Sequence, residues 1–223
     1  MLLTSSIQRD IQLLLYDQQN APNPRRVRIF FAEKEIAYDR KQINIVQGEN
    51  LSPEFLSINP RGRLPALVLD DGTVLDESVA ICRYVEELYP DPPLMGTDTL
   101  SRARIEARQR HIEFDGLLPA SEVYRNAYPR FQTRGVGGNV GVINAIPDLV
   151  TRGKTLMSNF FARLEEDLNH SPYIAGEEFS IADITALCTL DFATTSARIP
   201  FPINCPAIQR WYQTVSARPS ATA

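Results

Sequence analysis

The pattern of apolar residues changes near residue 90, and this change most constrains what the chain can fold into. Before it, short apolar or alternating runs are separated by stretches with helical spacing. The strand-like runs are residues 12–16, 38–45, 66–69 and 73–76, and the hairpin dipeptide Asp71-Gly72 separates the last two. The helix-like stretches are residues 25–35, 53–58 and 77–88, with Pro24 and Ser52 placed to open the first two. The order β-α-β-α-β-β-α predicts a thioredoxin-like α/β domain with a mixed sheet.

The strand signals fade after residues 90–93 (PDPP), which forbid regular structure and indicate a linker. The later stretches with helical spacing are residues 102–124, 149–168, 181–195 and 207–217. The glycine-rich residues 135–141 predict a flexible loop between the first two of them. We therefore expect a thioredoxin-like domain at residues 1–89 with an extra tail at 1–10, a linker at 90–99, and an all-helical domain at 100–223.

Composition excludes several classes of function. The chain carries 23 Lys and Arg against 27 Asp and Glu, a net charge of −4. Its densest basic run, residues 25–28 (RRVR), is too short for a nucleic-acid groove. No run of about 18 apolar residues could span a membrane, and the first ten residues lack the features of a signal peptide. Three widely spaced cysteines and two histidines predict neither a disulfide framework nor a metal site. We expect a cytoplasmic protein without nucleic-acid, membrane or metal partners.

Two motifs carry a resemblance to a known family. The first is residues 59–66 (NPRGRLPA), followed by Asp71-Gly72, Glu77-Ser78 and an amphipathic helix. The second is residues 173–184 (YIAGEEFSIADI), at the start of a predicted helix. In this order and separation they resemble the cytosolic glutathione transferases, and the yeast-type and nu-like branches in particular. The resemblance implies glutathione as co-substrate, a second small electrophilic or disulfide substrate, and a homodimer.

The first motif indicates how glutathione would bind. A proline after Leu64 at a loop-to-strand junction suits a cis Leu64–Pro65 bond, which would turn the Leu64 backbone outward to pair with an extended peptide. The resemblance implies that this peptide is the cysteinyl part of glutathione. Ser78 stands where a helix begins, so unpaired N–H groups and its hydroxyl favour a carboxylate there, while Glu77 can accept from an ammonium. The family uses this pair for the γ-glutamyl end. The alternative is that Ser78 only caps its helix and that Glu77 is a solvated acid.

Asn50 and Arg63 are the candidates for the glycine carboxylate of glutathione. In the theta-like branch a histidine occupies the position of Asn50, so this chain lacks a possible charge there. Arg63 could instead supply a charge-assisted hydrogen bond. The alternative for Arg63 is a solvated surface side chain.

The catalytic position departs from the common pattern of the family. Such transferases place Tyr, Ser or Cys after the first strand to stabilise the glutathione thiolate, but here the serine position holds Ala21 and the cysteine position holds Asn23. Pro22-Asn23 resembles the nu class, which implies that the Asn23 amide stabilises the thiolate. The alternative is that Asn23 merely caps its helix.

The yeast-type branch offers a second possibility for the thiolate. Residues 21–26 (APNPRR) resemble the corresponding segment of that branch, which also lacks Tyr, Ser and Cys at the catalytic position. In that branch, polar residues of the helical domain hold a water molecule instead. Asn126 and Tyr128 are the candidates for that role here. An apolar acceptor pocket facing Asn23 is expected from Phe114, Leu117, Tyr124, Tyr128 and Phe131, although such aromatic spacing also fits plain core.

The second motif has a structural interpretation. Ser180 and Asp183 stand three residues apart, which predicts a capping box without a catalytic role. Cys82, Cys188 and Cys205 fall within or beside helical patterns and are expected to be inert.

Three functions follow from these residues. The first is a detoxifying glutathione transferase whose thiolate attacks a small electrophile. The second is a glutathione-dependent disulfide reductase of the nu type. The third is a non-catalytic binding protein with the same fold, because Tyr, Ser and Cys are all missing from the catalytic position.

Overall fold

The computed structural model describes residues 12–223, so the tail predicted at residues 1–10 lies outside the described residues. A mixed four-stranded sheet comes first, in the strand order β2-β1-β3-β4. The parallel pair is β1 with β2, and the two antiparallel pairs are β1 with β3 and β3 with β4. The strands are β1 (Leu14–Asp17), β2 (Asp39–Gln42), β3 (Ala66–Val68) and β4 (Val74–Asp76). The predicted thioredoxin-like fold is confirmed, although each strand is shorter than predicted.

The hairpin between β3 and β4 also differs slightly from the prediction. Leu69 donates its N–H to Thr73, and Gly72 donates back to Leu69, so residues 70–72 form the connection. Gly72 has a φ of +83°, which glycine adopts without steric cost. The turn is therefore one residue longer than the Asp71-Gly72 dipeptide alone predicts.

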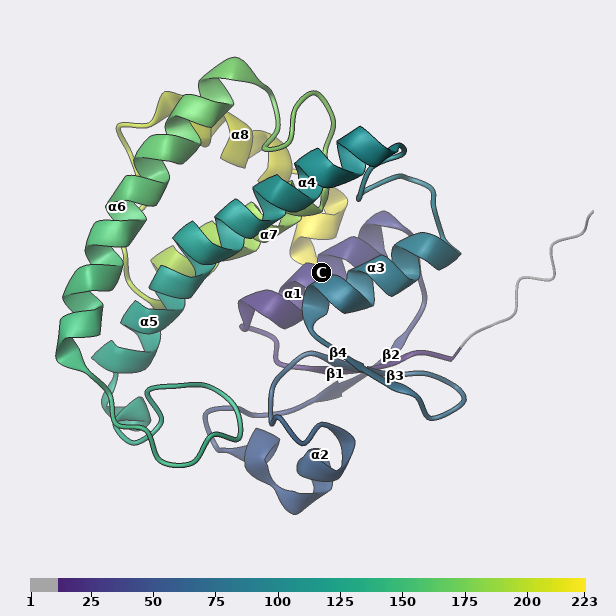
Figure 1. Ribbon diagram of the computed structural model, residues 1–223, viewed down its shortest axis with the longest axis vertical. Coiled ribbons are helices and arrows are strands. Elements are labelled where there is room, and N and C mark those ends of the chain that lie inside the picture. The colour runs from purple at the N-terminus through teal and green to yellow at the C-terminus, as the bar shows by residue number, and fades with distance from the viewer. Residues whose placement is uncertain (1–11) are drawn as a thin grey trace, which may run out of the picture.

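Helices cover both faces of this sheet (Figure 1). They are α1 (Pro22–Glu33), α2 (Pro53–Ile58) and α3 (Ser78–Leu88). Side chains alternate along β1, so Leu15 packs with α1 and α3 on one face, while Tyr16 packs with Phe55 of α2 on the other. Ser52 caps α2 as predicted by accepting from the N–H of Phe55 at 3.2 Å.

The start of α1 corrects one prediction. The helix begins at Pro22 rather than Pro24, and its N-cap is Ala21, whose side chain makes no capping hydrogen bond. Both prolines fit the first turn because the N–H that each lacks would have no partner there. Asn23 therefore lies inside the first turn, and the alternative that it caps the helix is wrong.

The rest of the chain is helical, as predicted. The helices are α4 (Thr99–His111), α5 (Leu118–Ala127), α6 (Pro147–His170), α7 (Ile181–Asp191) and α8 (Pro206–Ser216). A π-helical turn, Ile112–Leu117, joins α4 to α5, and a second, Phe192–Ser196, extends α7. The predicted helix at residues 102–124 is thus continuous in the structure, with a π-helical turn between its two α-helical parts.

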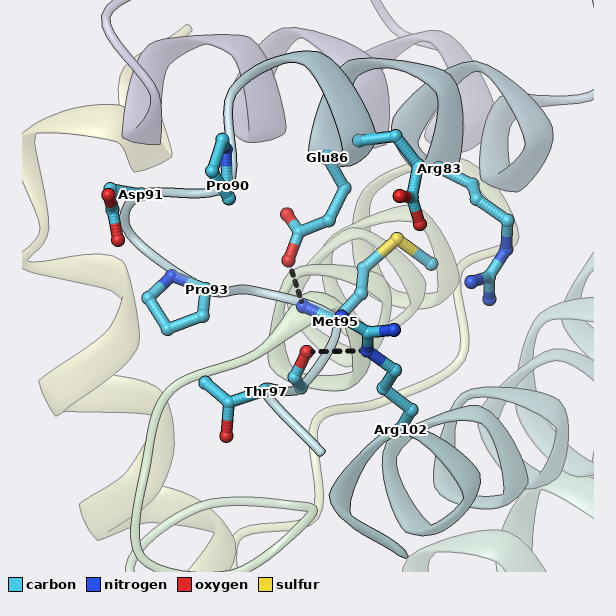
Figure 2. A pocket seen from close by; sticks show the side chains of 10 residues that line it. Arg83, Glu86, Pro90, Asp91, Pro93, Met95, Thr97 and Arg102 are labelled. Carbon is cyan, nitrogen blue, oxygen red and sulfur yellow. Dashed lines mark hydrogen bonds between the residues drawn. The ribbon is translucent and has the colours of Figure 1, made fainter. Parts of the chain in front are cut away.

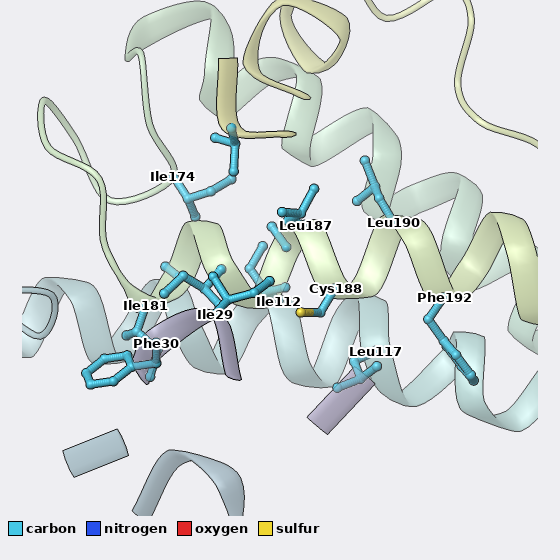
Figure 3. Packing of buried hydrophobic residues seen from close by; sticks show 14 of the residues in the cluster. Ile29, Phe30, Ile112, Leu117, Ile174, Ile181, Leu187, Cys188, Leu190 and Phe192 are labelled. Carbon is cyan, nitrogen blue, oxygen red and sulfur yellow. The ribbon is translucent and has the colours of Figure 1, made fainter. Parts of the chain in front are cut away.

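Helix α7 is the centre of the core and packs against α1 across the two parts of the chain. All its residues from Ile181 to Leu190 are buried, the polar Asp183, Thr185 and Thr189 included, so other segments cover this helix on every side. Figure 3 shows Cys188 of α7 in the same cluster as Ile29 of α1 and Ile112 of the first π-helical turn. Helix α1 is therefore held from both sides, by the sheet and by α7.

The capping box at the start of α7 is confirmed. Ser180 accepts from the N–H of Ala182, and the Asp183 carboxylate accepts from the N–H of Ser180 at 3.0 Å. Asp183 also accepts from the N–H of Ile174 and from Trp211 Nε1 at 2.8 Å. This buried carboxylate ties three segments together and has a structural role.

Between residues 12 and 223, no helix is long and apolar enough to cross a bilayer. No group of three or more His, Cys, Asp or Glu side chains is arranged to hold a metal ion within the same range.

Candidate active site

In the first turn of α1, a single residue, Asn23, has a backbone N–H without a hydrogen-bond partner among the described residues. Pro22 and Pro24 have no N–H, and Arg25 already donates its own to the carbonyl of Ala21 at 3.2 Å. The N–H of Asn23 has no partner within the described part of the chain. Since a helix N-terminus carries a partial positive charge, Asn23 offers a backbone donor and a side-chain amide at a position that favours an anion.

Arg26 brings Asn23 and Ser78 together. Its Nη1 lies 3.0 Å from Asn23 Oδ1 and 2.5 Å from Ser78 Oγ, and donates to both. Asn23 belongs to α1 and Ser78 to α3, so one guanidinium bridges the starts of two helices. The residues predicted for the thiol and for the γ-glutamyl carboxylate are therefore neighbours in the structure.

Ser78 and Glu77 differ sharply in exposure at the start of α3. Ser78 is buried, whereas the Glu77 side chain is 59% exposed and lies 3.5 Å from Arg61. Glu77 has a φ of +65°, a conformation that costs a non-glycine residue about 1–3 kcal/mol. The backbone here is strained at the point where β4 turns into α3.

The Leu64–Pro65 bond is cis, as predicted. Leu64 lies between the Asn59–Arg63 loop and β3, and its backbone N–H and C=O form no hydrogen bond with any other residue of the described chain. Such a pair of free backbone groups is what an extended peptide needs for a short ladder.

Asn50 and Arg63 occupy different environments. Asn50 is buried, and its Nδ2 donates to the carbonyl of Gly62 at 2.7 Å, so it holds the loop that precedes Leu64. Its Oδ1 is buried without a hydrogen-bond partner among the described residues. Arg63 is exposed, and its backbone carbonyl accepts from Asn59 Nδ2 at 2.9 Å. Their contacts with a glycine carboxylate stay predictions.

A loop of the helical domain supports the same segment from outside. We call residues 134–146 the docking loop, because Asn139 donates its N–H to the carbonyl of Arg61 at 2.7 Å. Arg134 Nη1 donates to the carbonyl of Ile45 at 3.2 Å. A Cβ on Gly138 would lie 2.8 Å from the same Arg61 carbonyl and 2.9 Å from the Arg63 guanidinium. The glycine-rich sequence predicts a flexible loop, and in the structure Gly138 permits close approach to the other domain.

The residues predicted for the acceptor pocket differ in how far they are exposed to solvent. Phe114 is 61% exposed and follows Glu113, whose carboxylate lies 3.1 Å from Arg26. Tyr124 instead packs in an aromatic cluster with Phe192, their ring centroids 5.2 Å apart. Phe114 is thus exposed to solvent, while Tyr124 lies within the helical domain.

The two polar candidates of the helical domain are already engaged. Asn126 donates from Nδ2 to the carbonyl of Glu122 at 2.8 Å and accepts at Oδ1 from the N–H of Ile146. The hydroxyl of Tyr128 donates to the carbonyl of Ser196 at 2.7 Å. Both side chains stabilise local structure, and their role in holding a water stays a prediction.

Two cavities lie near the junction of the domains. One, of about 530 Å³, opens beside the start of α1, where Pro22 and Arg25 contribute to its wall. The other, of about 230 Å³, lies at the linker, where Glu86 accepts from the N–H of Met95 and Arg102 donates to Gly96 (Figure 2). No predicted site residue lines either cavity.

The three cysteines are free and two of them are inaccessible. Burial raises the pKa of the Cys188 thiol to about 11, and it raises the pKa of the Cys82 thiol still further. Neither thiol ionises near neutral pH, so the prediction of inert cysteines holds for both.

Known proteins match this chain over most of its length. The description "Glutathione S-transferase, N-terminal domain" fits residues 21–88, and "Glutathione S-transferase, C-terminal domain" fits residues 148–219. Glutathione S-transferase 2 of Saccharomyces cerevisiae is 35% identical over 212 residues, which cover 94% of this chain and 88% of the yeast protein. The chain belongs to the glutathione S-transferase family.

Solved structures agree with this assignment. The crystal structure of Gtt2 from Saccharomyces cerevisiae superposes with a TM-score of 0.83 at 32% identity, covering 93% of the transferase described here and 97% of the yeast chain. A glutathione S-transferase of class Gtt2 from Vibrio parahaemolyticus gives a TM-score of 0.78 at 35% identity, covering 93% and 94%. The resemblance to the yeast-type branch is confirmed.

The sequence alone does not single out Arg26, whose guanidinium bridges Asn23 and Ser78 in the structure. Arg26 stands in the runs at residues 21–26 and 25–28, yet its side chain is fully buried. One signal in the sequence could have found it. Arg26 stands among the apolar residues Val27, Ile29 and Phe30 of a helix that must be largely buried, and a buried charge requires polar partners.

Proposed function

We propose that this glutathione transferase binds glutathione between Ser78 and Arg63 and presents its thiolate to a small electrophile. The observation that carries the proposal is the shared contact of Asn23 and Ser78 with Arg26 Nη1, because it joins a thiol subsite to a carboxylate subsite. The γ-glutamyl carboxylate accepts from Ser78, and the ammonium approaches the exposed Glu77. The cysteinyl backbone pairs with Leu64, preceding the cis Pro65.

The glycine carboxylate lies toward Arg63 and the loop that Asn50 holds. Arg63 is exposed and free of an ion pair among the described residues, so its guanidinium is available to an anion. Asn50 acts through the Gly62 carbonyl, which it fixes at 2.7 Å.

Asn23 stabilises the thiolate in this proposal. A thiol has a pKa near 8.5, and lowering it by two units requires about 2.7 kcal/mol. A hydrogen bond to a charged group supplies about 1.5–3 kcal/mol, and a helix N-terminus about 0.3–1 kcal/mol. The amide and N–H of Asn23 together reach this sum without an ionisable residue.

The acceptor substrate meets the thiolate on the side of the helical domain. Phe114 supplies an exposed aromatic face, and Tyr124, Asn126 and Tyr128 of the helical domain supply the rest of the proposed pocket. The second substrate is a small electrophile or a disulfide. Detoxification in the cytoplasm is the proposed setting, and the three free cysteines are consistent with a reducing compartment.

We also propose a homodimer. The family resemblance supports this proposal, and the helical domain has exposed apolar side chains that an interface could cover, Leu100, Leu118 and Leu156 among them. Light scattering should give about twice the 25.1 kDa chain mass, and a mass of one chain at micromolar concentration would contradict the dimer.

The test compares two reactions of the same purified protein. Conjugation of glutathione with a chlorodinitrobenzene should exceed reduction of a glutathione mixed disulfide. Asn23→Ala should slow conjugation by about 10–100-fold near neutral pH, from a loss of about 1.5–3 kcal/mol. This loss of rate should shrink as the pH approaches the pKa of the free glutathione thiol, because the thiolate then forms without help from Asn23.

Asn126→Ala and Tyr128→Phe are the controls, and both should retain the pH profile of the unmodified protein. A pH-dependent loss in these two but not in Asn23→Ala would assign the thiolate to the helical domain. Fast disulfide reduction with negligible conjugation would favour the reductase. Tight glutathione binding with neither activity would favour the binding protein.

A further inference from the structure

Arg26 is a charged side chain buried where four segments meet. It is fully inaccessible, and beyond Asn23 and Ser78 its Nε donates to Thr185 Oγ1 of α7 at 2.8 Å. Its Nη1 also lies 3.1 Å from Glu113 of the first π-helical turn. Burying an ion pair is costly, and packed apolar side chains would often stabilise a fold equally well. The contacts of Arg26 therefore suggest a role besides stability.

The direction of these hydrogen bonds decides which groups remain free. A guanidinium has donors only, so Asn23 must turn its carbonyl oxygen toward Arg26, as Oδ1 does at 3.0 Å. The opposite orientation would set the amide NH₂ against the guanidinium, donor against donor. The Asn23 NH₂ group, which has no partner in the described part of the chain, thus faces away from Arg26 as a donor.

The same argument applies to Ser78. Its Oγ accepts from Arg26 at 2.5 Å, so its own proton must point elsewhere. A hydroxyl that accepts on one side donates on the other. Both residues therefore present donors, and donors are what a thiolate and a carboxylate require.

We propose that Arg26 is a positioning residue that fixes Asn23 and Ser78 as hydrogen-bond donors toward glutathione. The inference rests on the proposed function, because it assumes that these two residues contact the thiolate and the γ-glutamyl carboxylate. Arg26 itself touches neither group and acts through Asn23 and Ser78. One guanidinium thereby couples the two subsites.

The neighbouring arginines of α1 have other partners. Arg25 pairs with Asp191 at 2.5 Å, and Arg28, also buried, pairs with Asp17 at 2.5 Å. Neither contacts Asn23 or Ser78 among the described residues. Arg28 is therefore a matched control: a buried, ion-paired guanidinium of the same helix outside the proposed network.

The test measures the pKa of the glutathione thiol bound to the protein, by ultraviolet absorbance of the thiolate across a pH titration. Arg26→Lys keeps the charge but loses the planar fork that reaches Asn23 and Ser78 together. The bound thiol pKa should rise by about one unit, which leaves about tenfold less thiolate at any pH well below that pKa. Arg28→Lys should leave that pKa unchanged, whatever it does to thermal stability.

The other titratable groups that face Arg26 do not confuse this measurement. Cys82 of α3 and Cys188 of α7 have thiol pKa values raised by burial, so neither ionises near neutral pH. Glu113 forms an ion pair with Arg26, and Arg110 also pairs with Glu113 at 2.7 Å. Glu113→Gln, titrated in parallel, reports any part of the shift that arises from this carboxylate.

A double variant separates positioning from a direct charge effect. Arg26→Lys combined with Asn23→Ala should raise the bound thiol pKa no further than Asn23→Ala alone, because Arg26 acts through Asn23. An unchanged thiol pKa in Arg26→Lys, or full additivity in the double variant, would overturn the positioning role. If Asn23→Ala itself leaves the thiol pKa unchanged, the proposed role of Asn23 fails instead.

A measurement on the unmodified protein covers the case in which Arg26→Lys does not fold. The Asn23 side-chain NH₂ resonances should shift when the bound thiol ionises, since that group donates to the sulfur. The same resonances should stay in place when S-methylglutathione, which cannot ionise, is titrated over the same range. Absence of a shift with glutathione would show that the NH₂ group faces elsewhere and would refute the proposal.

Discussion

The two ends of the proposed glutathione site are built in opposite ways. At the γ-glutamyl end, Ser78 is buried and held by the fully inaccessible Arg26. At the glycine end, Arg63 is exposed, and its loop is supported by the docking loop through Asn139 and Gly138. One end is set by close packing within α1, α3 and α7, and the other by a few contacts between two loops.

This difference predicts how each end responds to change. Hydrogen bonds among buried groups are costly to lose, because the group left behind has no water to replace its partner. Exposed charges interact weakly and are screened by salt. We therefore expect glutathione affinity to depend most on the buried end, less on the docking loop and least on the exposed charge.

The largest expected effect is that of Ser78→Ala. The variant removes the donor to the γ-glutamyl carboxylate and should weaken glutathione by about 1–3 kcal/mol, or about 5–150-fold. Calorimetry measures the affinity directly. Thr189→Val is the control, since it removes another buried hydroxyl, whose one hydrogen bond among residues 12–223 is to the carbonyl of Thr185 in its own helix. Equal affinities for the Ser78→Ala variant and the unmodified protein would remove Ser78 from the site.

The second effect tests the docking loop. Gly138 and Gly141 both have positive φ, +94° and +74°, so alanine strains either by about 1–2 kcal/mol. Only at position 138 would the added Cβ meet Arg61 and Arg63, whereas at 141 it would meet open space. Gly138→Ala should therefore weaken glutathione by about 3–10-fold and Gly141→Ala should not. Identical glutathione affinities in these two variants would mean that the docking loop does not shape the site.

Sequence alone predicts features that depend on neighbouring residues better than it predicts contacts between distant ones. The cis Leu64–Pro65 bond, the hairpin and the capping box at Ser180 each depend on residues a few positions apart. Patterns of this kind are visible in a single chain.

The contacts that the sequence did not predict join distant residues. Arg26 meets Thr185 across 159 positions, and Asn139 meets Pro60 across 79. Nothing in the periodicity of either segment specifies such a partner. The start of α1 differs from the prediction for another reason: Pro22 and Pro24 both suit a first helical turn, so the sequence pattern does not choose between them.

The smallest expected effect is that of Arg63→Ala, and it sharpens the comparison most. An exposed ion pair contributes about 0.2–1 kcal/mol, so the loss of glutathione affinity should be about 1.5–5-fold. It should shrink further in concentrated salt, because the charge is solvated. Arg163→Ala removes the same charge from an exposed pair with Asp115 on the helical domain, and it should leave the affinity unchanged. A loss that exceeds tenfold and persists in salt would mean that glutathione buries Arg63 when it binds. Both ends of the site would then be buried from water in the complex, and the difference in exposure between Ser78 and Arg63 would exist only in the unliganded protein.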